Sequence, residues 1–327
     1  MGVRDELAKA ITKGIRAFHS SPHDFERFDI SKIGTGEGAQ MYGHGLYFAE
    51  NPAVSGQGGQ YWDQFKRRFD RHTQDAADVL REHGFDRQEA AASIAAQIDA
   101  VKARLATAGP NANFEGMQAA LRNWQAQHDL IAGGGPVGPR TYEVNIKADP
   151  ATMLDWDKPL AAQPDIYRKL DISGAAGPVR RLIDEYGLDT ITGGKAYQQL
   201  AAGRSSSFSS DPMPRGWAAS RVLEREGIPG IKYLDEGSRI SSPAQIKAIQ
   251  DNIAQRQALL AANPGNPTDT KWLNEYQDML QRATNPTSNY VVFDPANVDI
   301  LKKYGVAAAP IGALGATFDP SQYEAAP

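Results

Sequence analysis

Two spacings of hydrophobic residues alternate along the chain, and they predict two kinds of segment. Short apolar runs between Ile15 and Phe48 are separated by Ser, Pro and Gly, which is typical of strands and loops. Between about Tyr61 and Ile131, Pro and Gly are scarce and the apolar residues follow helical spacing, which predicts two or three packed helices. Their apolar faces comprise Ile94, Ile98, Val101 and Leu105 in one series and Phe114, Met117, Leu121, Trp124 and Ile131 in the other.

The same alternation continues in the second half of the chain. Tyr142, Val144 and Ile146 alternate with polar neighbours, as the residues of a half-buried strand do. Short helices, a serine-rich loop (RSSSFSSDP) and a further strand pattern (GIPGIKYLD) follow. A second helical stretch from Pro243 to about Arg282 is broken by the Pro and Gly residues of NPGNP, and the strand patterns NYVVFD and VDIL come after it. We therefore predict an α+β fold: one domain built from widely separated strands, with helical hairpins inserted between them.

The composition is that of a folded globular protein. Hydrophobic residues make up 41% and charged residues 23% of the 327 residues, which excludes a disordered or fibrous chain. The net charge of -4 gives no basic excess of the kind that duplex DNA or an anionic membrane attracts, although nucleic acid stays open as a substrate. Cysteine is absent, which excludes disulfides, zinc–thiolate sites and thiol nucleophiles.

The distribution of apolar residues also bears on location. No segment approaches the roughly 18 apolar residues of a membrane span, and the N-terminus has no apolar run of signal-peptide length. We expect no membrane partner and a cytoplasmic location, either in a bacterium or in a target cell that receives the protein. The oligomeric state cannot be predicted from the sequence.

Several short motifs lack residues or spacings that the sites they suggest require. The glycines of GTGEGAQ fall at positions 34, 36 and 38, outside the dinucleotide-binding fingerprint, so a flexible loop is the better interpretation. GGK at Gly193–Lys195 lacks the earlier glycine and the following Ser or Thr of a phosphate-binding loop. His19 and His23 are four residues apart, but Pro22 between them excludes the helical geometry of a metal-binding pair. We expect no metal site.

Three other segments combine small, polar and aromatic residues in ways that core packing does not explain. Phe18–Pro22 places a histidine at the end of an apolar run, directly before two serines. Tyr42–Ala49 holds two glycines just before an aromatic pair, and glycine allows close approach of backbones. Asn289–Asp294 is a strand pattern with a polar amide at its entrance. These three are the candidate functional segments.

Together these segments resemble a known family. FHSSP, YGHGLYFAENPAVS and NYVVFD look like the three motifs of the H-Y-E branch of ADP-ribosyltransferases, which includes diphtheria toxin and the poly(ADP-ribose) polymerases. The chain is similar in particular to the ADP-ribosyltransferase-like domains in polyvalent proteins of phages and other mobile elements. The resemblance implies a fold of split antiparallel sheets with helical insertions. Residues 1–60, 136–240 and 286–306 would form this domain, 61–135 a helical insertion, 241–285 a helical hairpin insertion and 307–327 a flexible tail.

The resemblance implies a role in NAD binding for five residues. His19 matches the histidine that holds the adenosine-side ribose of NAD. Ser20 lies where relatives use a backbone group to bind the nicotinamide amide. Tyr47 matches the tyrosine that stacks on the nicotinamide ring, and Ser55 matches a serine that binds the carboxamide. Tyr61 lies three positions beyond the place of a second stacking aromatic residue.

The third motif departs from the family pattern. Asn289 stands where the full triad has a glutamate that binds a ribose hydroxyl and helps to activate the acceptor. An amide can hydrogen-bond a hydroxyl, but it carries no negative charge and removes no proton, so chain elongation is not expected. Asp235 and Glu236 follow a predicted strand and either replace the missing carboxylate or are ordinary loop acids before Gly237.

The chemistry of such an enzyme agrees with this residue set. Cleavage of the bond between nicotinamide and ribose passes through an oxocarbenium-like state. An enzyme that binds the leaving nicotinamide tightly and orients the ribose would favour this state. We therefore expect a mono-ADP-ribosyltransferase that uses NAD as substrate and modifies a protein or nucleic-acid target, as a phage or bacterial effector or toxin domain. The alternatives are an NAD glycohydrolase and a catalytically degenerate binding or structural module of a mobile-element protein.

Overall fold

A computed structural model describes residues 14–33, 40–109, 112–172, 174, 177–202, 216–239 and 242–305. The expected glycine-rich loop at Gly34–Gln40, apart from Gln40, lies outside the described residues. So do the serine-rich loop at 204–212 and the expected tail at 307–327.

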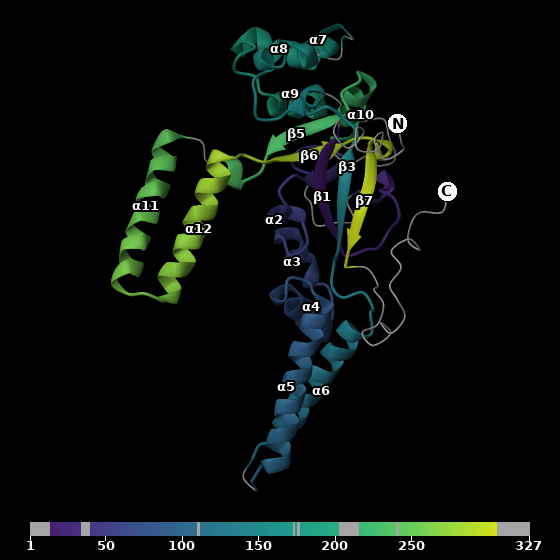
Figure 1. Cartoon of the computed structure of the whole chain (residues 1–327). Helices are drawn as coiled ribbons and strands as arrows, with labels where there is room; N and C mark the ends of the chain where they lie inside the picture. The colour runs from purple at the N-terminus through teal and green to yellow at the C-terminus, as the bar shows by residue number, and fades with distance from the viewer. Residues whose placement is uncertain are drawn as a thin grey trace, which may run out of the picture. The chain divides into compact units, whose positions relative to one another are not determined.

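A seven-stranded sheet runs through the described residues, and the described helices lie in the segments between its strands (Figure 1). The strand order is β4-β5-β6-β2-β1-β3-β7, so neighbours in space come from segments far apart in sequence. This mixed α/β architecture confirms the general character predicted from the hydrophobic pattern. The strands are β1 (Ile15–Ser21), β2 (Leu46–Ala49), β3 (Arg140–Ile146), β4 (Leu154–Asp155), β5 (Gly230–Leu234), β6 (Ser288–Val292) and β7 (Val298–Tyr304).

The sheet is mixed, whereas the resemblance implies split antiparallel sheets. β2 pairs antiparallel with β6, and β6 pairs antiparallel with β5, but β4 runs parallel to β5. Parallel neighbours need a long crossover connection, and here the chain between β4 and β5 supplies one through several helices. The parallel pair therefore follows from the helical segment that separates these two strands.

The helices fall into groups along the chain. Those before β3 are α2 (Pro52–Ser55), α3 (Gln60–Lys66), α4 (Arg71–Glu82), α5 (Arg87–Thr107) and α6 (Phe114–Ala132). Those between β4 and β5 are α7 (Pro164–Ile172), α8 (Gly177–Tyr186), α9 (Gly193–Ala202) and α10 (Trp217–Arg225), and those between β5 and β6 are α11 (Pro243–Ala262) and α12 (Pro267–Thr284). Short 3₁₀ turns lie at η1 (Ile30–Lys32), η2 (Pro150–Thr152), η3 (Leu160–Ala162), η4 (Gly237–Arg239) and η5 (Pro295–Asn297).

The chain divides into two compact units. The first takes in the residues up to His19, Glu26–Val54 and Glu143–Leu301, and the second takes in Ser20–Phe25, Ser55–Tyr142 and the residues from Lys302 onward. In the first unit, residues of β5 and β6 pack with residues of α9 and α10; Ile231, Val291, Leu200 and Leu223 are each 0% exposed.

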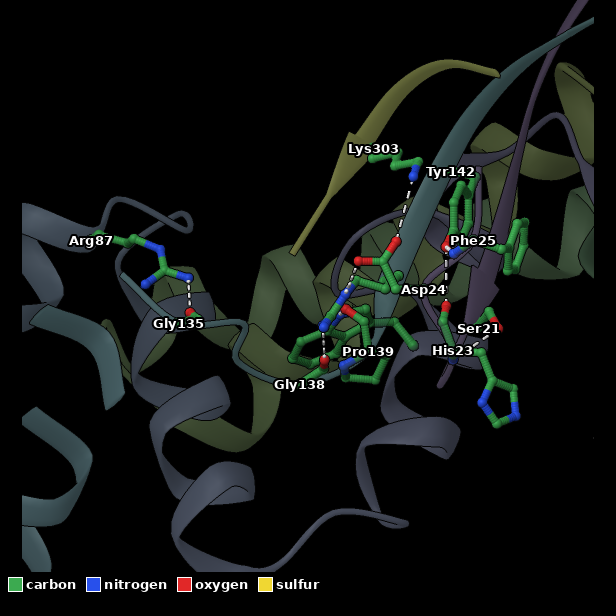
Figure 2. Close-up of polar contacts among 12 residues, drawn as sticks. Ser21, His23, Asp24, Phe25, Arg87, Gly135, Gly138, Pro139, Tyr142 and Lys303 are labelled. Atoms are coloured by element: carbon green, nitrogen blue, oxygen red, sulfur yellow. Dashed lines mark hydrogen bonds and ion pairs between the residues drawn. The ribbon is translucent and has the colours of Figure 1, made fainter. Parts of the chain in front are cut away.

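The second unit has a separate core around α3–α6. Trp62, Ile94 and Ile131 are almost fully buried there, and Leu121 and Trp124 pack against this core, so the two predicted apolar faces meet in part. Phe114, at the start of the second predicted face, is 41% exposed. Arg87, at the start of α5, donates to the carbonyl of Ile131 in the last turn of α6 at 2.9 Å. It also donates to the carbonyl of Gly135, just beyond that helix, at 2.6 Å (Figure 2).

Residues close in sequence define the start of α11 in the α11–α12 hairpin. Ser242 and Gln245 form a capping box at the start of α11, directly before Pro243. The two helices lie side by side (Figure 1), and the Arg256–Asp269 ion pair (2.8 Å) joins them. Their contact buries few large apolar side chains, since Leu259 (42%), Trp272 (41%) and Met279 (36%) stay exposed.

The predicted strand forms at β3, but it is buried on both faces and not half-buried. Tyr142, Val144 and Ile146 are each 0% exposed, but Glu143 and Asn145 are also buried, at 9% and 6%. Glu143 can be buried because Arg16 of β1 forms an ion pair with it at 2.6 Å. The partner lies far away in sequence, so the alternation alone could not reveal that both faces of this strand are covered.

Candidate functional site

His19 and Tyr47 contact each other in the first unit. Nδ1 of His19 lies 2.9 Å from the backbone carbonyl oxygen of Tyr47, and because a carbonyl only accepts, Nδ1 carries the proton and donates. The imidazole packs edge-on against Phe28, with ring centroids 5.2 Å apart, and beside Phe48 at 5.8 Å. Burial lowers the pKa of His19, against the opposing effect of this hydrogen bond. The ring is therefore neutral near pH 7, with Nε2 as its acceptor nitrogen.

The ring of Tyr47 is fixed at its hydroxyl end. The hydroxyl donates to the carbonyl of Gly43 at 2.7 Å and accepts from the amide of Tyr42 at 3.2 Å. The side chain is half-buried, and its ring meets Tyr233 edge-on at 6.5 Å. Tyr47 thus has a defined orientation and keeps part of its surface exposed, as a stacking residue requires.

The two glycines before Tyr47 are explained by close packing on β5 and β6. Gly43 has φ +121°, and a Cβ there would lie 2.8 Å from Cδ1 of Ile231. A Cβ on Gly45 would lie 2.6 Å from Cγ1 of Val291 and 2.8 Å from the carbonyl oxygen of Val292. A side chain at either position would push the turn away from the sheet and displace Tyr47.

Tyr197 of α9 anchors the same turn, and sequence reasoning missed it. Its hydroxyl accepts from the amide of His44 at 3.1 Å and lies 2.8 Å from the carbonyl of Gly216 and from the hydroxyl of Ser220. Burial raises its pKa, so it stays a neutral phenol. The contact with His44 spans 153 residues, and a tyrosine on an amphipathic helix gives no signal of this role.

Asn289 lies on the same face of the sheet as Tyr47. The register sets Asn289 of β6 opposite Ala49 of β2 and Tyr233 of β5. Directly opposite residues project to one face, and so do residues two apart on one strand. Tyr47, which is two residues before Ala49, therefore projects to the face that carries the Asn289 amide.

The amide of Asn289 has an unfilled acceptor. Among the described residues, its Oδ1 is buried and has no hydrogen-bond partner. A buried polar atom without a partner costs about 1–3 kcal/mol, so such an atom in a folded protein calls for an explanation. A ligand hydroxyl that donates to Oδ1 would supply one.

The two acids proposed as substitutes lie in different surroundings. Asp235 is 2% exposed, and its carboxylate accepts from the amide of Ser238 at 2.7 Å and from the hydroxyl of Thr287. Glu236, the next residue, is exposed. Both oxygens of Asp235 are thus engaged by protein groups. A role for either acid in place of the missing glutamate stays a prediction.

Glu50 is a further acid beside the third motif that sequence reasoning missed. Its Oε2 accepts from the amide of Ser288 at 3.0 Å, and its own amide donates to the carbonyl of Ser288 at 3.0 Å. Burial and the charge of Glu50 raise the pKa of Tyr290. Because Glu50 directly follows Ala49, strand alternation directs its side chain to the face opposite Asn289. Glu50 therefore supports the backbone of β6 without facing the Asn289 amide.

Ser20 and Ser55 bind each other in the second unit. The amide of Ser20 donates to Oγ of Ser55 at 3.0 Å, and the hydroxyl of Ser20 donates to the carbonyl of Ser55 at 2.9 Å. Both residues are buried, at 2% and 6% exposed. These are the two groups that the resemblance assigns to one carboxamide. Tyr61, on α3 of the same unit, has a 40% exposed side chain.

The loop after Ser20 is held by Tyr142 of β3. Figure 2 shows its hydroxyl between the carbonyl of His23, to which it donates at 3.0 Å, and the amide of Phe25, from which it accepts at 2.9 Å. The Phe25 ring stacks on Tyr142 with centroids 4.1 Å apart, and the imidazole of His23 points away from this cluster (Figure 2). Burial raises the pKa of Tyr142 to about 12, so its proton is retained.

Charged groups hold the same loop from strands β3 and β7. Asp24 forms ion pairs with Arg140 at 3.6 Å and with Lys303 at 3.5 Å. The segment that follows His19 and Ser20 is therefore fixed on several sides. The residues after the first motif therefore have a structural role in fixing this loop, which the sequence pattern did not reveal.

Comparison with known proteins identifies no relative. No protein-family model matches the chain, and neither the curated proteins nor the solved structures contain a match. In the described part of the chain, no group of three or more His, Cys, Asp or Glu side chains could hold a metal ion. None of the described helices combines the length and apolar character needed to cross a membrane.

Proposed function

We propose that this chain is an NAD-dependent mono-ADP-ribosyltransferase of an effector or toxin type. It would transfer one ADP-ribose unit from NAD to a protein or nucleic-acid target and release nicotinamide. The observation that carries the proposal is the buried, unpartnered Oδ1 of Asn289 on the sheet face to which Tyr47 projects. An acceptor beside a half-exposed aromatic ring suits a ligand that joins a flat ring to a hydroxylated sugar.

In the proposed reaction, each side chain binds or orients part of the substrate. Tyr47 stacks on the nicotinamide, and Asn289 accepts a hydrogen bond from a ribose hydroxyl. The bond between the ribose carbon and the pyridinium nitrogen breaks, and its electron pair neutralises the nicotinamide ring. A nucleophilic atom of the target then bonds to the ribose carbon and loses its proton to solvent. Asn289 cannot remove that proton, so it acts by orienting the ribose.

His19 does not share the sheet face of Tyr47 and Asn289. Phe18 of β1 is paired with Ala49 of β2, so the next residue, His19, projects to the opposite face, where its ring lies beside Phe48. Its ribose-binding role in the proposal rests on the resemblance alone.

One incubation tests the proposal against its alternatives. The purified chain is mixed with a bacterial lysate and NAD that carries separate labels on nicotinamide and on the adenylate phosphate. Free nicotinamide with adenylate label in macromolecules supports a transferase, while free nicotinamide alone indicates an NAD glycohydrolase. Neither product, with the chain folded, indicates a binding or structural module and contradicts the proposal.

A matched pair of tyrosine variants tests the site. Tyr47→Ala should weaken NAD binding in titration calorimetry by about 1 kcal/mol or more, roughly fivefold, because one stacking partner is lost. Tyr186→Ala removes a tyrosine that is 56% exposed on α8 and should leave binding unchanged. Unchanged NAD affinity in Tyr47→Ala would reject the nicotinamide site.

A further inference from the structure

Buried polar groups join the two ends of the α11–α12 hairpin at its base. The chain leaves the sheet after Leu234 of β5 and returns at Ser288 of β6, and these two residues are paired. Just beyond this pair, three residues bind one another: Asp235, Ser238 and Thr287. We call this group the stem clasp.

The stem clasp is a closed network. The carboxylate of Asp235 accepts from the amide of Ser238 at 2.7 Å and from the hydroxyl of Thr287. The amide of Thr287 donates to the hydroxyl of Ser238 at 2.9 Å, and the amide of Asp235 donates to the carbonyl of Thr287 at 3.2 Å. Asp235 and Ser238 are each 2% exposed, so water does not readily compete for these bonds.

The clasp lies directly beside the third-motif position. Thr287 is followed by Ser288 and then Asn289, so loss of the clasp would free the end of β6 that carries Asn289. On the other side, Glu50 holds Ser288 through both backbone groups, at 3.0 Å each. The backbone before Asn289 is therefore held on two flanks.

The backbone matters here because the Asn289 side chain offers little anchoring of its own. Its Oδ1 has no partner among the described residues, so no bond at that atom fixes the amide. The position of this oxygen is then set by the strand beneath it. A long insertion between two paired strands leaves their ends free to separate, and a clasp at the point of exit opposes that separation.

We propose that Asp235 is a positioning residue, which closes the stem of the α11–α12 hairpin and thereby orients Asn289 toward the ribose. The inference rests on the proposed function. It gives Asp235 a role through Thr287 and the backbone of β6, in place of direct contact with substrate.

Thr287 provides the sharpest test because two variants differ only in the hydroxyl. Thr287→Val removes the donor to Asp235 at nearly constant volume, whereas Thr287→Ser keeps it. For Thr287→Val we expect kcat for nicotinamide release to fall on the order of 10-fold or more, since small displacements of an orienting group are costly. KM for NAD should change less than kcat, and Thr287→Ser should recover most of the loss. Asp251→Asn, on an exposed i,i+4 pair with Lys247 in α11, is the control and should change neither constant.

Hydrogen exchange separates this inference from the proposed function. In Thr287→Val, the amides of Ser288 and Asn289 should exchange faster than in the wild type, whether or not the chain is active. Unchanged exchange at these amides, or equal kcat in Thr287→Val and wild type, would overturn the positioning role. If the wild type released no nicotinamide, the proposed function would be rejected. The exchange rates of Ser288 and Asn289 would still test whether the stem clasp holds the end of β6. Should Thr287→Val not fold, Ser238→Ala, which removes only the acceptor of the Thr287 amide, is measured in the same way.

Discussion

Replacing Asn289 by leucine should make the protein more stable and less active at once. The side chains have similar branching, so Asn289→Leu exchanges the amide for apolar groups without leaving a large cavity. Oδ1 of Asn289 is buried without a partner, and the neighbouring positions on this face are Ala49 and Tyr233. The substitution therefore removes an unsatisfied acceptor from a largely apolar environment.

The structure sets the size of both effects. An unsatisfied buried polar atom costs about 1–3 kcal/mol, so its removal should raise the free energy of unfolding by about 1 kcal/mol or more. Loss of one polar contact in the transition state should lower the rate of nicotinamide release by about 10-fold to 100-fold, which corresponds to roughly 1.4–2.7 kcal/mol. Stability and turnover thus change in opposite directions. This is common where a functional site requires a polar group that does not contribute to the stability of the fold.

Urea unfolding followed by circular dichroism measures the first effect, and nicotinamide release measures the second. Asn274→Leu, at an exposed position of α12, serves as control and should stay within about 0.5 kcal/mol of the wild type in stability, with unchanged turnover. If Asn289→Leu were less stable than the wild type by 1 kcal/mol or more, Oδ1 would have a partner that stabilises the fold. If the variant kept full turnover, Asn289 would have no part in the reaction.

Two further predictions concern the first and second motifs. Gly45→Ala should lower the free energy of unfolding by about 1–3 kcal/mol in urea, because its Cβ would lie 2.6 Å from Val291, whereas Gly135→Ala, with open space around it, should change stability little. Burial lowers the pKa of His19 below its ordinary value of about 6.5, so its contribution to stability is present above that pH and is lost as pH falls through the lowered value. His19→Gln should therefore lose less stability than the wild type between about pH 7 and 5; an equal loss would contradict the lowered pKa.

Local patterns in the sequence predicted much of the fold but not the contacts that complete its strands. The alternation at Tyr142 to Ile146 predicted β3, because apolar side chains at a period of two are enough to form a strand. It missed the burial of Glu143, because that depends on Arg16, which lies 127 residues away. A local hydrophobic pattern predicts the type of secondary structure, but it does not identify the distant residue that forms an ion pair or hydrogen bond with that segment.

In the candidate site, too, local features could be predicted from the sequence and long-range contacts could not. The glycines before Tyr47 could be predicted, since a glycine pair beside aromatic residues signals close packing, and the structure gives that packing its partners in β5 and β6. The anchors of these segments could not be predicted: Tyr197 holds His44 across 153 residues, and Thr287 meets Asp235 across 52. Each anchor is a common residue type in an unremarkable local pattern.

Asn289 is the residue of the candidate site that local structure explains least. In the sequence it is a polar residue at the entrance of a strand that continues with apolar residues, and this could mean only that the strand begins there. The structure removes that simple explanation, because β6 begins one residue earlier and Oδ1 is buried without a partner. A leucine or valine would suit this position better for stability alone. On the face of Tyr47, with the backbone held by Glu50 and the stem clasp, the Asn289 amide suits the proposed ligand, which would donate a hydrogen bond to Oδ1.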